Sequence, residues 1–326
     1  MARVIWSALL ASVPIASGWG PSAARAEDRT IQRIDAFGGL TIADSRGLPG
    51  QTQGTSFALG YGVEGGVRSV RGRHVFAGDF HVVEGLSFSL SNEVFFKSLD
   101  DARLRTSYAF TITPWLDFTA WADASAPMFG SFVREPEGTT FDVRRADGLH
   151  ELHGGPTLAL TQPFLPLRAN ETVGVALHPL RRPFLGIDVR AGIGVDHAVA
   201  DGQLEVQDDA STADVEAIEL ESHHALVPAL EVALAGELEE RLGYGLDVAA
   251  RVPLAYTDVA LVAGRTIPEL TMVRLRLSVS IQILPWLTTD YELVVDRNPF
   301  LSDGIGVANR LMLAAHPLAR WATEAP

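Results

Sequence analysis

The sequence predicts an all-β protein whose antiparallel strands close into an up-and-down transmembrane β-barrel of about 12 strands. Three observations predict this class. Apolar and polar residues alternate over long stretches, as they do along a β-strand with one apolar face. Short turns and longer loops alternate along the chain. Beyond the N-terminal region, no stretch comes near the ~18 uninterrupted apolar residues that a membrane-spanning helix needs.

The clearest alternation lies in the segment 271–297. Its apolar positions are Val273, Leu275, Leu277, Val279, Ile281 and Ile283, each separated from the next by one polar residue. Pro285 and Trp286 interrupt the pattern, and a second strand resumes it from Leu287. The segment therefore predicts a β-hairpin with one apolar and one polar face.

The segment 103–123 repeats this hairpin around Pro114 and Trp115. A three-residue turn in each hairpin, at 113–115 and 284–286, keeps apolar residues opposite apolar residues. The predicted apolar pairs are Ile112 with Leu116, Phe110 with Phe118, Ile283 with Leu287, and Val279 with Tyr291. The predicted charged pairs on the other face are Arg105 with Asp123 and Arg274 with Asp296. Opposite charges in such positions contribute about 0.2–1 kcal/mol each.

The first 26 residues are typical of a secretory signal peptide. Arg3 supplies the positive start, an apolar run follows, and Ala24-Arg25-Ala26 fits the cleavage pattern before Glu27. The run is shorter than the ~20 residues that a membrane anchor needs. We therefore expect residues 1–26 to be removed and residues 27–326 to form a single barrel domain.

The remaining strands and turns follow the same pattern. Further strands are predicted at 30–43, 56–67, 74–96 (with a possible break near Gly85), 184–198, 226–234, 242–254 and 305–316. We expect 153–177 to be one strand that Pro163 and Pro166 interrupt. Short turns fall at 68–73, 113–115, 178–183, 235–241 and 284–286, and longer loops at 44–54, 98–102, 128–152, 199–218, 255–269 and 298–304. Short periplasmic turns and longer extracellular loops are typical of such barrels.

Alternation alone does not distinguish a membrane barrel from a soluble β-sandwich, because both have one apolar face. Two further features favour the membrane. Trp115, Phe184 and Trp286 lie at the short turns, where an aromatic girdle would meet the membrane interface. Charges of both signs occur on the polar face of single strands, as is expected of a face that lines a hydrated lumen. We therefore expect the apolar face to meet lipid.

The repeated Pro-Trp-Leu turns at 114–116 and 285–287 and the long alternating strands resemble the Gram-negative outer-membrane β-barrel class over residues ~30–316. The resemblance implies an outer-membrane location, contact with outer-membrane lipid and lipopolysaccharide, and handling by the barrel-assembly machinery. One feature departs from the class. Its members usually end on a strand that closes with Phe or Trp, whereas here Trp321 is followed by five further residues.

The polar face gives the candidate functional residues. The predicted lumen lining is Arg105, Asp123, Asp188, Arg190, Asp247, Arg251, Arg274, Arg276, Asp290, Glu292 and Asp296. A barrel of about 12 strands lies between small barrels filled by side chains and 16-stranded barrels with a water channel. Two interpretations stay open: opposed charges that screen small polar solutes, and ion pairs that neutralise one another and fill the interior.

Composition excludes several other functions. The chain has 26 basic and 40 acidic residues; removal of Arg3 and Arg25 with the leader leaves 24 against 40, a formal charge of −16. Such an acidic chain argues against nucleic acid as a partner. The absence of Cys excludes disulfides and thiolate chemistry. We expect no cofactor.

Metal and catalytic sites are not predicted either. The acidic segment 201–221 lacks the spacing of an EF-hand. The pairs His150 and His153, and His223 and His224, are weak metal candidates. His223 and His224 in particular are adjacent at the start of a strand, where neighbouring side chains point to opposite faces. A nucleophile–base pair drawn from Ser87, Ser89, Ser91, His74 and His81 has no specific spacing. We therefore expect the protein to have no enzymatic activity.

The sequence thus predicts a narrow, porin-like channel for small hydrophilic solutes in the outer membrane. Two alternatives remain: a closed structural or adhesive barrel, and an outer-membrane lipid-modifying enzyme.

Overall fold

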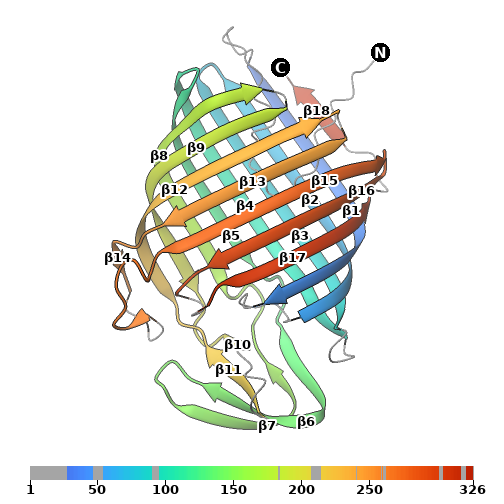
Figure 1. The fold of residues 1–326 in the computed structure, drawn as a ribbon, viewed down its shortest axis with the longest axis vertical. Coiled ribbons are helices and arrows are strands. Elements are labelled where there is room, and N and C mark those ends of the chain that lie inside the picture. The colour runs from blue at the N-terminus through green and yellow to red at the C-terminus, as the bar shows by residue number, and fades with distance from the viewer. Residues whose placement is uncertain are drawn as a thin grey trace.

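A computed structural model describes residues 28–46, 54–89, 95–182, 184–206, 214–239, 241–257, 259, 262–300, 304–316 and 321–325. Within these residues, twelve antiparallel strands form one closed barrel, because the pairing of β12 with β13 joins the two ends of the sheet. Figure 1 shows the barrel with its strands strongly tilted. The predicted all-β class and strand number are confirmed. The predicted leader lies outside the described residues, so its cleavage stays a prediction.

The barrel strands follow one another around the wall in chain order. They are β1 (Arg29–Arg46), β2 (Gly54–Arg71), β3 (His74–Ser89), β4 (Phe95–Thr113), β5 (Leu116–Ala126), β8 (Leu167–Arg182), β9 (Leu185–Val199), β12 (His223–Leu238), β13 (Leu242–Arg251), β15 (Met272–Leu284), β16 (Leu287–Arg297) and β17 (Gly306–Ala315). Two short strands, β14 (Ala255–Tyr256) and β18 (Trp321–Ala325), pair with β12 and β1. Among the described residues, no helix is long and apolar enough to cross a membrane.

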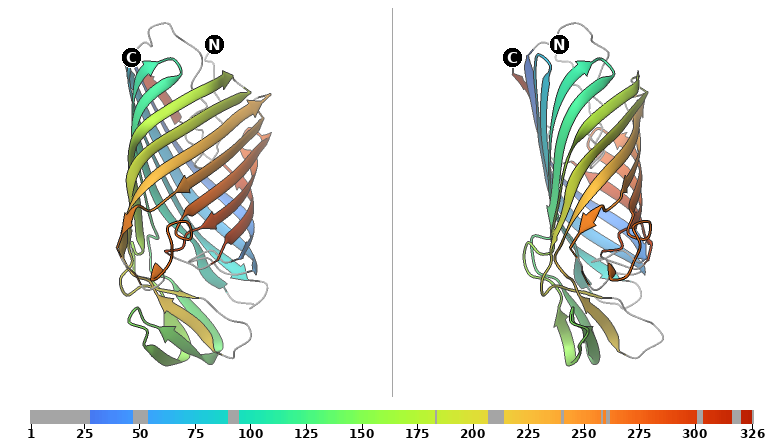
Figure 2. Two further views of the ribbon diagram at one scale, coloured as in Figure 1. Left: turned by 60° about the vertical axis from the view of Figure 1, so that its left-hand side comes forward. Right: turned by 90° about the vertical axis from the view of Figure 1, so that its left-hand side faces the viewer.

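A second, four-stranded sheet lies beyond one end of the barrel (Figures 1 and 2). It contains β6 (Phe132–Arg144), β7 (His150–Ala159), β10 (Leu204–Val206) and β11 (Val215–Glu219). We call it the outer sheet. The prediction of one interrupted strand over 153–177 is wrong: residues up to Ala159 belong to the outer sheet, and β8 starts at Leu167. The two prolines lie in the connection between these sheets and do not kink a barrel strand.

The two ends of the barrel differ in the length of their connections. The turns β2–β3, β4–β5, β8–β9, β12–β13 and β15–β16 are short and share one end, which we call the short-turn end. The connections β5–β8, β9–β12 and β13–β15 are long and share the other, the long-loop end, where the outer sheet lies. The predicted alternation of short turns and long loops is confirmed, but three of the predicted loops are wrong in part. Residues 98–102 lie within β4, and the segments 128–152 and 199–218 contain the strands β6 and β10 of the outer sheet.

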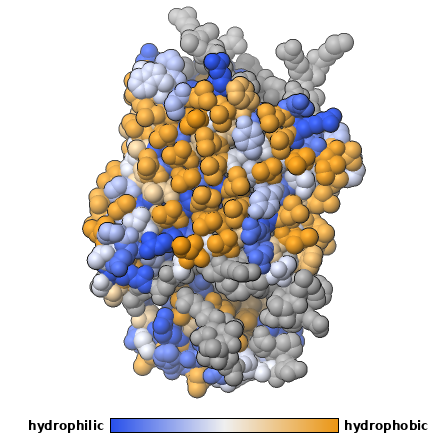
Figure 3. Space-filling view, viewed as in Figure 1, coloured by the Kyte–Doolittle hydropathy of each residue, from blue (hydrophilic) through white to orange (hydrophobic). Residues whose placement is uncertain are grey.

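Large apolar side chains cover the outside of the barrel. Leu59 is 70% exposed, and Leu40, Leu104, Val173 and Ile193 are among many others that face outward. Figure 3 shows apolar side chains over most of the barrel wall that it views. No second sheet packs on this face in the described residues, so the interpretation as a sandwich core is excluded. Trp115, Phe184 and Trp286 are each more than half exposed.

The register of the two Pro-Trp hairpins was predicted correctly except next to the turns. Phe110 pairs with Phe118, Val279 with Tyr291, Arg105 with Asp123, and Arg274 with Asp296. Each turn holds two residues, however, and a bulge precedes it, so that Leu116 pairs with Thr113 and Leu287 with Leu284. A bulge adds one unpaired residue to a strand, which alternation does not reveal. A register shift also occurs at Gly85, close to the predicted break in β3.

The C-terminal residues continue the barrel wall. Residues of β17 pair with 38–46 of β1, and Trp321 of β18 pairs with Ile34 farther along the same strand. The register between the last and the first strand therefore changes by two residues between these two stretches. Trp321 is part of a strand against β1, although it is not the final residue.

Candidate functional site

Charged side chains on the polar face meet inside the barrel. The guanidinium of Arg251 on β13 donates to Asp196 on β9 at 3.0 Å and to Asn170 on β8 at 3.4 Å, although β12 lies between β13 and β9. Arg190 on β9 lies 5.9 Å from the ring centre of Trp121 on β5, across β8. Contacts that pass over a neighbouring strand are possible only on the concave side, so this face lines the interior.

The structure brings most predicted lining residues into ion pairs. The pairs are Arg105–Asp123 at 3.2 Å, Arg274–Asp296 at 3.2 Å, Arg251–Asp196 at 3.0 Å, Arg190–Glu231 at 4.0 Å, and Arg276–Glu292 in close contact. Asp247 pairs in register with Arg276, and Asp290 accepts a hydrogen bond from Thr288 at 3.1 Å. Asp188 belongs to a histidine site described below. The role of these residues in a solute path stays a prediction.

Several interior charges were missed by the sequence reasoning. Asp196 and Glu231 both pair with Arg251, Arg310 lies 3.8 Å from Glu292, and Arg33 lies 3.9 Å from Glu64. Asp196 lies on the same face of β9 as Asp188 and Arg190, so the alternation could have found it. Glu64 and Glu231 lie among small and apolar neighbours, where a single charge gives little signal.

Water reaches many of these ion pairs. The side chains of Arg105 and Arg310 are 35% and 38% exposed, and those of Asp123 and Glu292 are about one fifth exposed. Pairs that water reaches contribute only about 0–1 kcal/mol each, because solvent screens them. The interior charges therefore solvate the lumen more than they stabilise the barrel.

A buried histidine site lies inside the short-turn end, on β8. His178 Nδ1 lies 2.5 Å from an oxygen of Asp188 on β9, and its Nε2 lies 3.1 Å from an oxygen of Asp117 on β5. Its backbone N–H donates to the carbonyl of Trp115 at 2.9 Å. We call this group the first His site. Because both ring nitrogens face a carboxylate, both carry a hydrogen and the ring is an imidazolium.

A second histidine site has the same form at the end of β17. His316 Nδ1 lies 3.1 Å from Asp35 on β1, and its Nε2 lies 3.3 Å from the Thr288 hydroxyl on β16. That hydroxyl donates to Asp290 at 3.1 Å, so it accepts the hydrogen of Nε2. The backbone N–H of His316 donates to the carbonyl of Trp286 at 2.9 Å. We call this group the second His site. Sequence reasoning assigned neither histidine a role.

An apolar cluster closes part of the interior at the long-loop end. It joins inward residues of β12 and β15 to the β13–β15 loop and to Phe300, and its members are Ala225, Val227, Val259, Val262, Leu270, Met272 and Phe300. The ring of His223 stacks on Phe300 with centres 4.9 Å apart. We call this group the apolar cap. The loop 255–269 was predicted only as an outer loop, without a role.

Hydrogen bonds hold the apolar cap to the barrel. Arg297 at the end of β16 donates to the carbonyls of Thr271 at 2.8 Å and Glu269 at 2.7 Å. Glu269 in turn accepts hydrogen bonds from the backbone N–H and the hydroxyl of Thr266, both at 2.7 Å. These bonds from Thr266 lower the pKa of Glu269 below its usual value. The loop is therefore folded against the mouth of the barrel.

The outer sheet carries its own polar contacts. Arg145 donates to Glu151 at 2.6 Å and lies 3.8 Å from Glu219; its hydrogen bond lowers the pKa of Glu151. Hydrogen bonds from Ser222 likewise lower the pKa of Asp201. The described part of the acidic segment 201–221 is thus folded into strands and turns of this sheet.

None of the histidine pairs considered from the sequence forms a metal centre in the described residues. His150 binds Asp142 at 3.0 Å, whereas His153 faces Glu151 at 3.3 Å. His224 points away from His223 and meets His197 of β9, with their Nδ1 atoms 2.6 Å apart. In the described part of the chain, no three His, Asp or Glu side chains are placed to hold one metal ion.

Of the candidate nucleophile–base residues, only the side chains of the two histidines are described. His74 is exposed and lies 2.8 Å from the Tyr108 hydroxyl, whereas His81 stacks on Phe37 inside the barrel. The two histidines thus lie on opposite faces of β3. Ser91 and the side chains of Ser87 and Ser89 lie outside the described residues.

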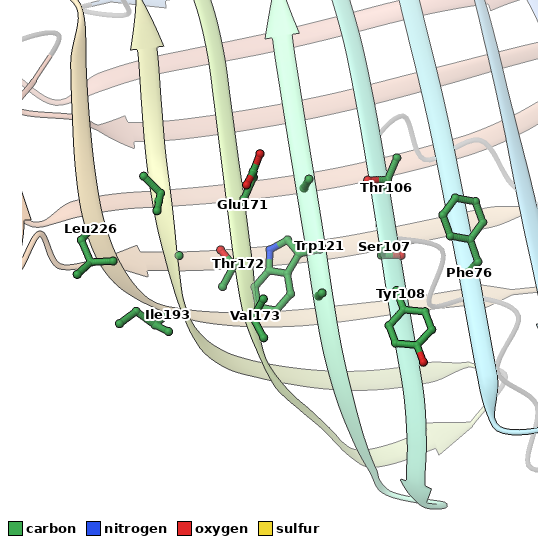
Figure 4. A pocket seen from close by; sticks show the side chains of 14 residues that line it. Phe76, Thr106, Ser107, Tyr108, Trp121, Glu171, Thr172, Val173, Ile193 and Leu226 are labelled. Atoms are coloured by element: carbon green, nitrogen blue, oxygen red, sulfur yellow. The ribbon is translucent and has the colours of Figure 1, made fainter.

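A hollow of about 500 Å³ lies in the outer wall over β4, β5, β8 and β9 (Figure 4). Phe76 and Tyr108 line one side, and Val173, Ile193 and Leu226 line the other. These five side chains belong to the outward, exposed apolar set. The hollow is therefore a recess in the surface that faces away from the charged interior, and it is not part of a solute path.

No protein-family model and no curated protein sequence matches this chain. Among solved structures, the fold is similar to the translocator domain of the autotransporter NalP from Neisseria meningitidis (10% identity, 90% of each chain covered, TM-score 0.40). It is also similar to the NanC porin (8% identity, 86% of this chain and 100% of that chain, TM-score 0.41).

A third similar structure is an outer-membrane channel from Pseudomonas putida F1 (9% identity, 91% of this chain and 98% of that chain, TM-score 0.40). The assignment rests on the geometry given above: a closed antiparallel wall, apolar outside and charged inside. The chain is a twelve-stranded β-barrel of the outer-membrane type.

Proposed function

We propose that this protein is a narrow, passive channel for small hydrophilic solutes in a bacterial outer membrane. The observation that carries the proposal is the charged interior that water still reaches, with Arg105 and Arg310 more than one third exposed. A lumen that served only as a packed core would exclude water from its side chains. A mosaic of both charge signs offers a polar path to small solutes without holding them tightly.

The orientation and the partners belong to the same proposal. The short-turn end faces the periplasm, and the long-loop end with the outer sheet faces outward, as loop lengths in such barrels indicate. The exposed apolar belt contacts outer-membrane lipid and lipopolysaccharide, and the barrel-assembly machinery inserts the chain. The cleaved leader would deliver it to the periplasm.

Planar-bilayer conductance and liposome swelling test the channel. We expect discrete conductance steps from the refolded protein and faster swelling with small sugars than with large ones. Arg274→Ala with Arg276→Ala removes two positive charges from the interior and should shift the ratio of cation to anion permeability. Arg145→Ala in the outer sheet is the matched control and should leave this ratio unchanged. Folded protein without any conductance would contradict the proposal.

A closed structural or adhesive barrel is the second candidate. The apolar cap favours it, because Val262 and Leu270 are fully buried at the long-loop end. The outer sheet also presents Leu149 and Leu152, both more than 60% exposed, to any surface it meets. Zero conductance together with cell or surface binding that Leu149→Ser and Leu152→Ser abolish would favour this candidate.

A lipid-modifying enzyme remains the third candidate, and we propose that the protein has no such activity. Phospholipase and lipopolysaccharide-deacylase assays on folded protein test this directly. Turnover that survives purification from a strain lacking such enzymes would overturn the non-enzymatic part of the proposal.

A further inference from the structure

Two segments of the chain, 103–116 and 274–287, are near copies of each other. When the two segments are aligned without a gap, eight of the fourteen positions are identical. These include Arg-Leu-Arg at the start and Pro-Trp-Leu at the end. A second repeated element follows each copy: His-Pro-Leu-Arg-Arg at 178–182 and His-Pro-Leu-Ala-Arg at 316–320. Strand alternation requires apolar and polar classes but not identical residues at fixed spacing, so these matches indicate an internal repeat.

The repeats occupy equivalent places in the barrel. The first segment runs along β4 into β5 and the second along β15 into β16. Each ladder shifts register just before the Pro-Trp turn, at Ile112 and at Ile283. β4 is the fourth barrel strand and β15 the tenth, so six strands, half of the barrel, separate the copies. The His-Pro elements likewise end the sixth and the twelfth strand.

The two His sites are equivalent in their contacts as well. In both, the histidine N–H donates to the carbonyl of the Trp in the preceding Pro-Trp turn at 2.9 Å. In both, Nε2 binds the residue two positions after that Trp, and Nδ1 binds an Asp on the following strand. The histidine side chains are 4% and 5% exposed. These Asp residues also match in sequence, as Ile34-Asp35 and Ile187-Asp188.

A break in the ladder explains why each site exists. β8 loses its regular pairing with β9 between Leu177 and Leu180. Between the pairs Gly38–Ala315 and Ile34–Trp321, the register of the last strand against β1 changes by two residues. Pro179 and Pro317 follow the histidines, and proline has no N–H to donate to a ladder. At each site the histidine ring joins three strands at the point where the ladder loses its regular register.

We infer that this barrel is a tandem duplication of a six-stranded unit, and that His178 and His316 are equivalent positioning residues, each of which bridges the ladder break at the end of its half. The first half contains β1–β5 and β8. The second half contains β9, β12, β13 and β15–β17. The two breaks differ in size and in connectivity. The first is a register shift of one residue between strands joined by a short turn, and the second is a shift of two residues at the seam between the last strand and the first.

The charges of the interior are consistent with this arrangement. Copies that are half a barrel apart should lie on opposite walls at the same level. Arg276 interacts electrostatically with Arg103 and Arg105 on the opposite wall, and Glu292 also interacts with Arg103. Arg105 and Arg276 are equivalent positions of the two Arg-Leu-Arg elements. Equivalent residues of the two halves thus approach each other across the lumen.

The copies differ at one informative point. After Pro-Trp-Leu, the inner face carries Asp117 and then Thr119 in the first half, but Thr288 and then Asp290 in the second. In the second half the Thr288 hydroxyl links the His316 ring to Asp290. If the sites are equivalent, the first site should accept the arrangement of the second. A site that evolved separately has no reason to accept it.

The exchange variant D117T/T119D, in the full chain, tests this. It reproduces the hydroxyl and carboxylate order of the second His site. The matched control D117V/T119D has the same carboxylate and nearly the same side-chain shape, but Val cannot relay the hydrogen bond. Urea unfolding of protein folded in lipid vesicles, followed by Trp fluorescence and gel mobility, gives the folded-to-unfolded ratio of each variant.

We expect D117T/T119D to keep this ratio within about threefold of the wild type and D117V/T119D to lower it roughly tenfold or more, because a charged hydrogen bond is lost. The reverse pair, T288D/D290T and T288V/D290T, should order in the same way at the second site. Equal loss in D117T/T119D and D117V/T119D would overturn the equivalence. Loss at one site but not at the other would overturn it too.

Discussion

The two ends of this barrel close in opposite ways. At the short-turn end, buried histidine rings join strands through carboxylates and a threonine hydroxyl, within a few residues of the turns. At the long-loop end, an apolar cap packs a loop from β13–β15 and Phe300 onto inward residues of β12 and β15. The first end depends on charges that lack water, and the second on apolar contact between distant segments. Polar contacts therefore fix the short-turn end of the lumen, and apolar packing fixes the long-loop end.

The difference also predicts how each end fails. A buried charge that loses its partner is costly, because water cannot replace the lost bond. An apolar cluster loses stability in proportion to the area and volume removed, and it can loosen without unfolding its support. Damage at the short-turn end should therefore reach the whole barrel, whereas damage at the long-loop end should stay local.

The largest effect is expected from His178→Ala. It leaves Asp117 and Asp188 buried without their shared cation, and breaking a buried pair costs about 3–5 kcal/mol. Urea unfolding in lipid vesicles measures the loss. His74→Ala, which removes an exposed histidine bonded to Tyr108, is the control and should cost little. Equal losses in both variants would remove the contrast between the ends.

The second effect is expected from Leu270→Ala in the apolar cap. Leu270 is fully buried, and Leu→Ala in a packed site costs about 2–5 kcal/mol. We expect the loop to become sensitive to protease and the conductance to rise, while barrel unfolding changes little. Leu254→Ala, at a position 54% exposed, is the matched control. A large fall in barrel stability would show that the cap is not a local unit.

A smaller effect is expected from Arg297→Ala. It removes the two hydrogen bonds to the carbonyls of Thr271 and Glu269, and bonds from a charged donor contribute about 1.5–3 kcal/mol. Faster hydrogen exchange in residues 266–272 would report the loosened cap. Arg297→Lys keeps the charge but not the two-pronged donor, so its effect should lie between those of Ala and the wild type. Unchanged exchange in both variants would exclude the role of this arginine.

The smallest effect is expected from pH at the long-loop end. The folded-state pKa values of Glu151, Asp201 and Glu269 are lowered by hydrogen bonds. Because these pKa values are lowered in the folded state, the ionised carboxylates contribute their full stabilisation above the usual pKa, which is 4.5 for Glu. This stabilisation is lost as the pH falls through the folded-state pKa values. We expect the protection of the outer sheet from hydrogen exchange, relative to the intrinsic exchange rate at each pH, to fall below about pH 4.5. Glu151→Gln should reduce the part of this response near Arg145, and an unchanged response would exclude that pair as its source.

Much of the fold could be predicted because alternation is a local property. The alternation within residues 103–123 and 271–297 was enough to predict both hairpins, their two faces and most of their register. The bulges at Ile112 and Ile283 could not be predicted, because an extra residue near a turn leaves the alternation of the flanking strand intact. The error over 153–177 has a related cause: β7 and β8 both have the pattern of strands, and the sequence does not say that they join different sheets.

The candidate site was predictable only in part. The inward face of each strand identified charges such as Arg105 and Asp123, since they alternate with outward apolar residues. The partners that lie on strands farther around the wall, such as Arg251 with Asn170, depend on closure and had no signal in the sequence. His178 and His316 have the pattern of turn residues, because His-Pro is typical of a turn.

The sequence by itself determined most of the barrel strands, their two faces and the alternation of short and long connections, because residues one to three positions apart decide these features. The tertiary structure alone decided what meets inside the barrel. Closure brought Asp35 to His316, 281 positions apart, and folded the β13–β15 loop into an apolar cap. Such contacts arise from the geometry of a closed wall, which places residues opposite each other without regard to their separation along the chain.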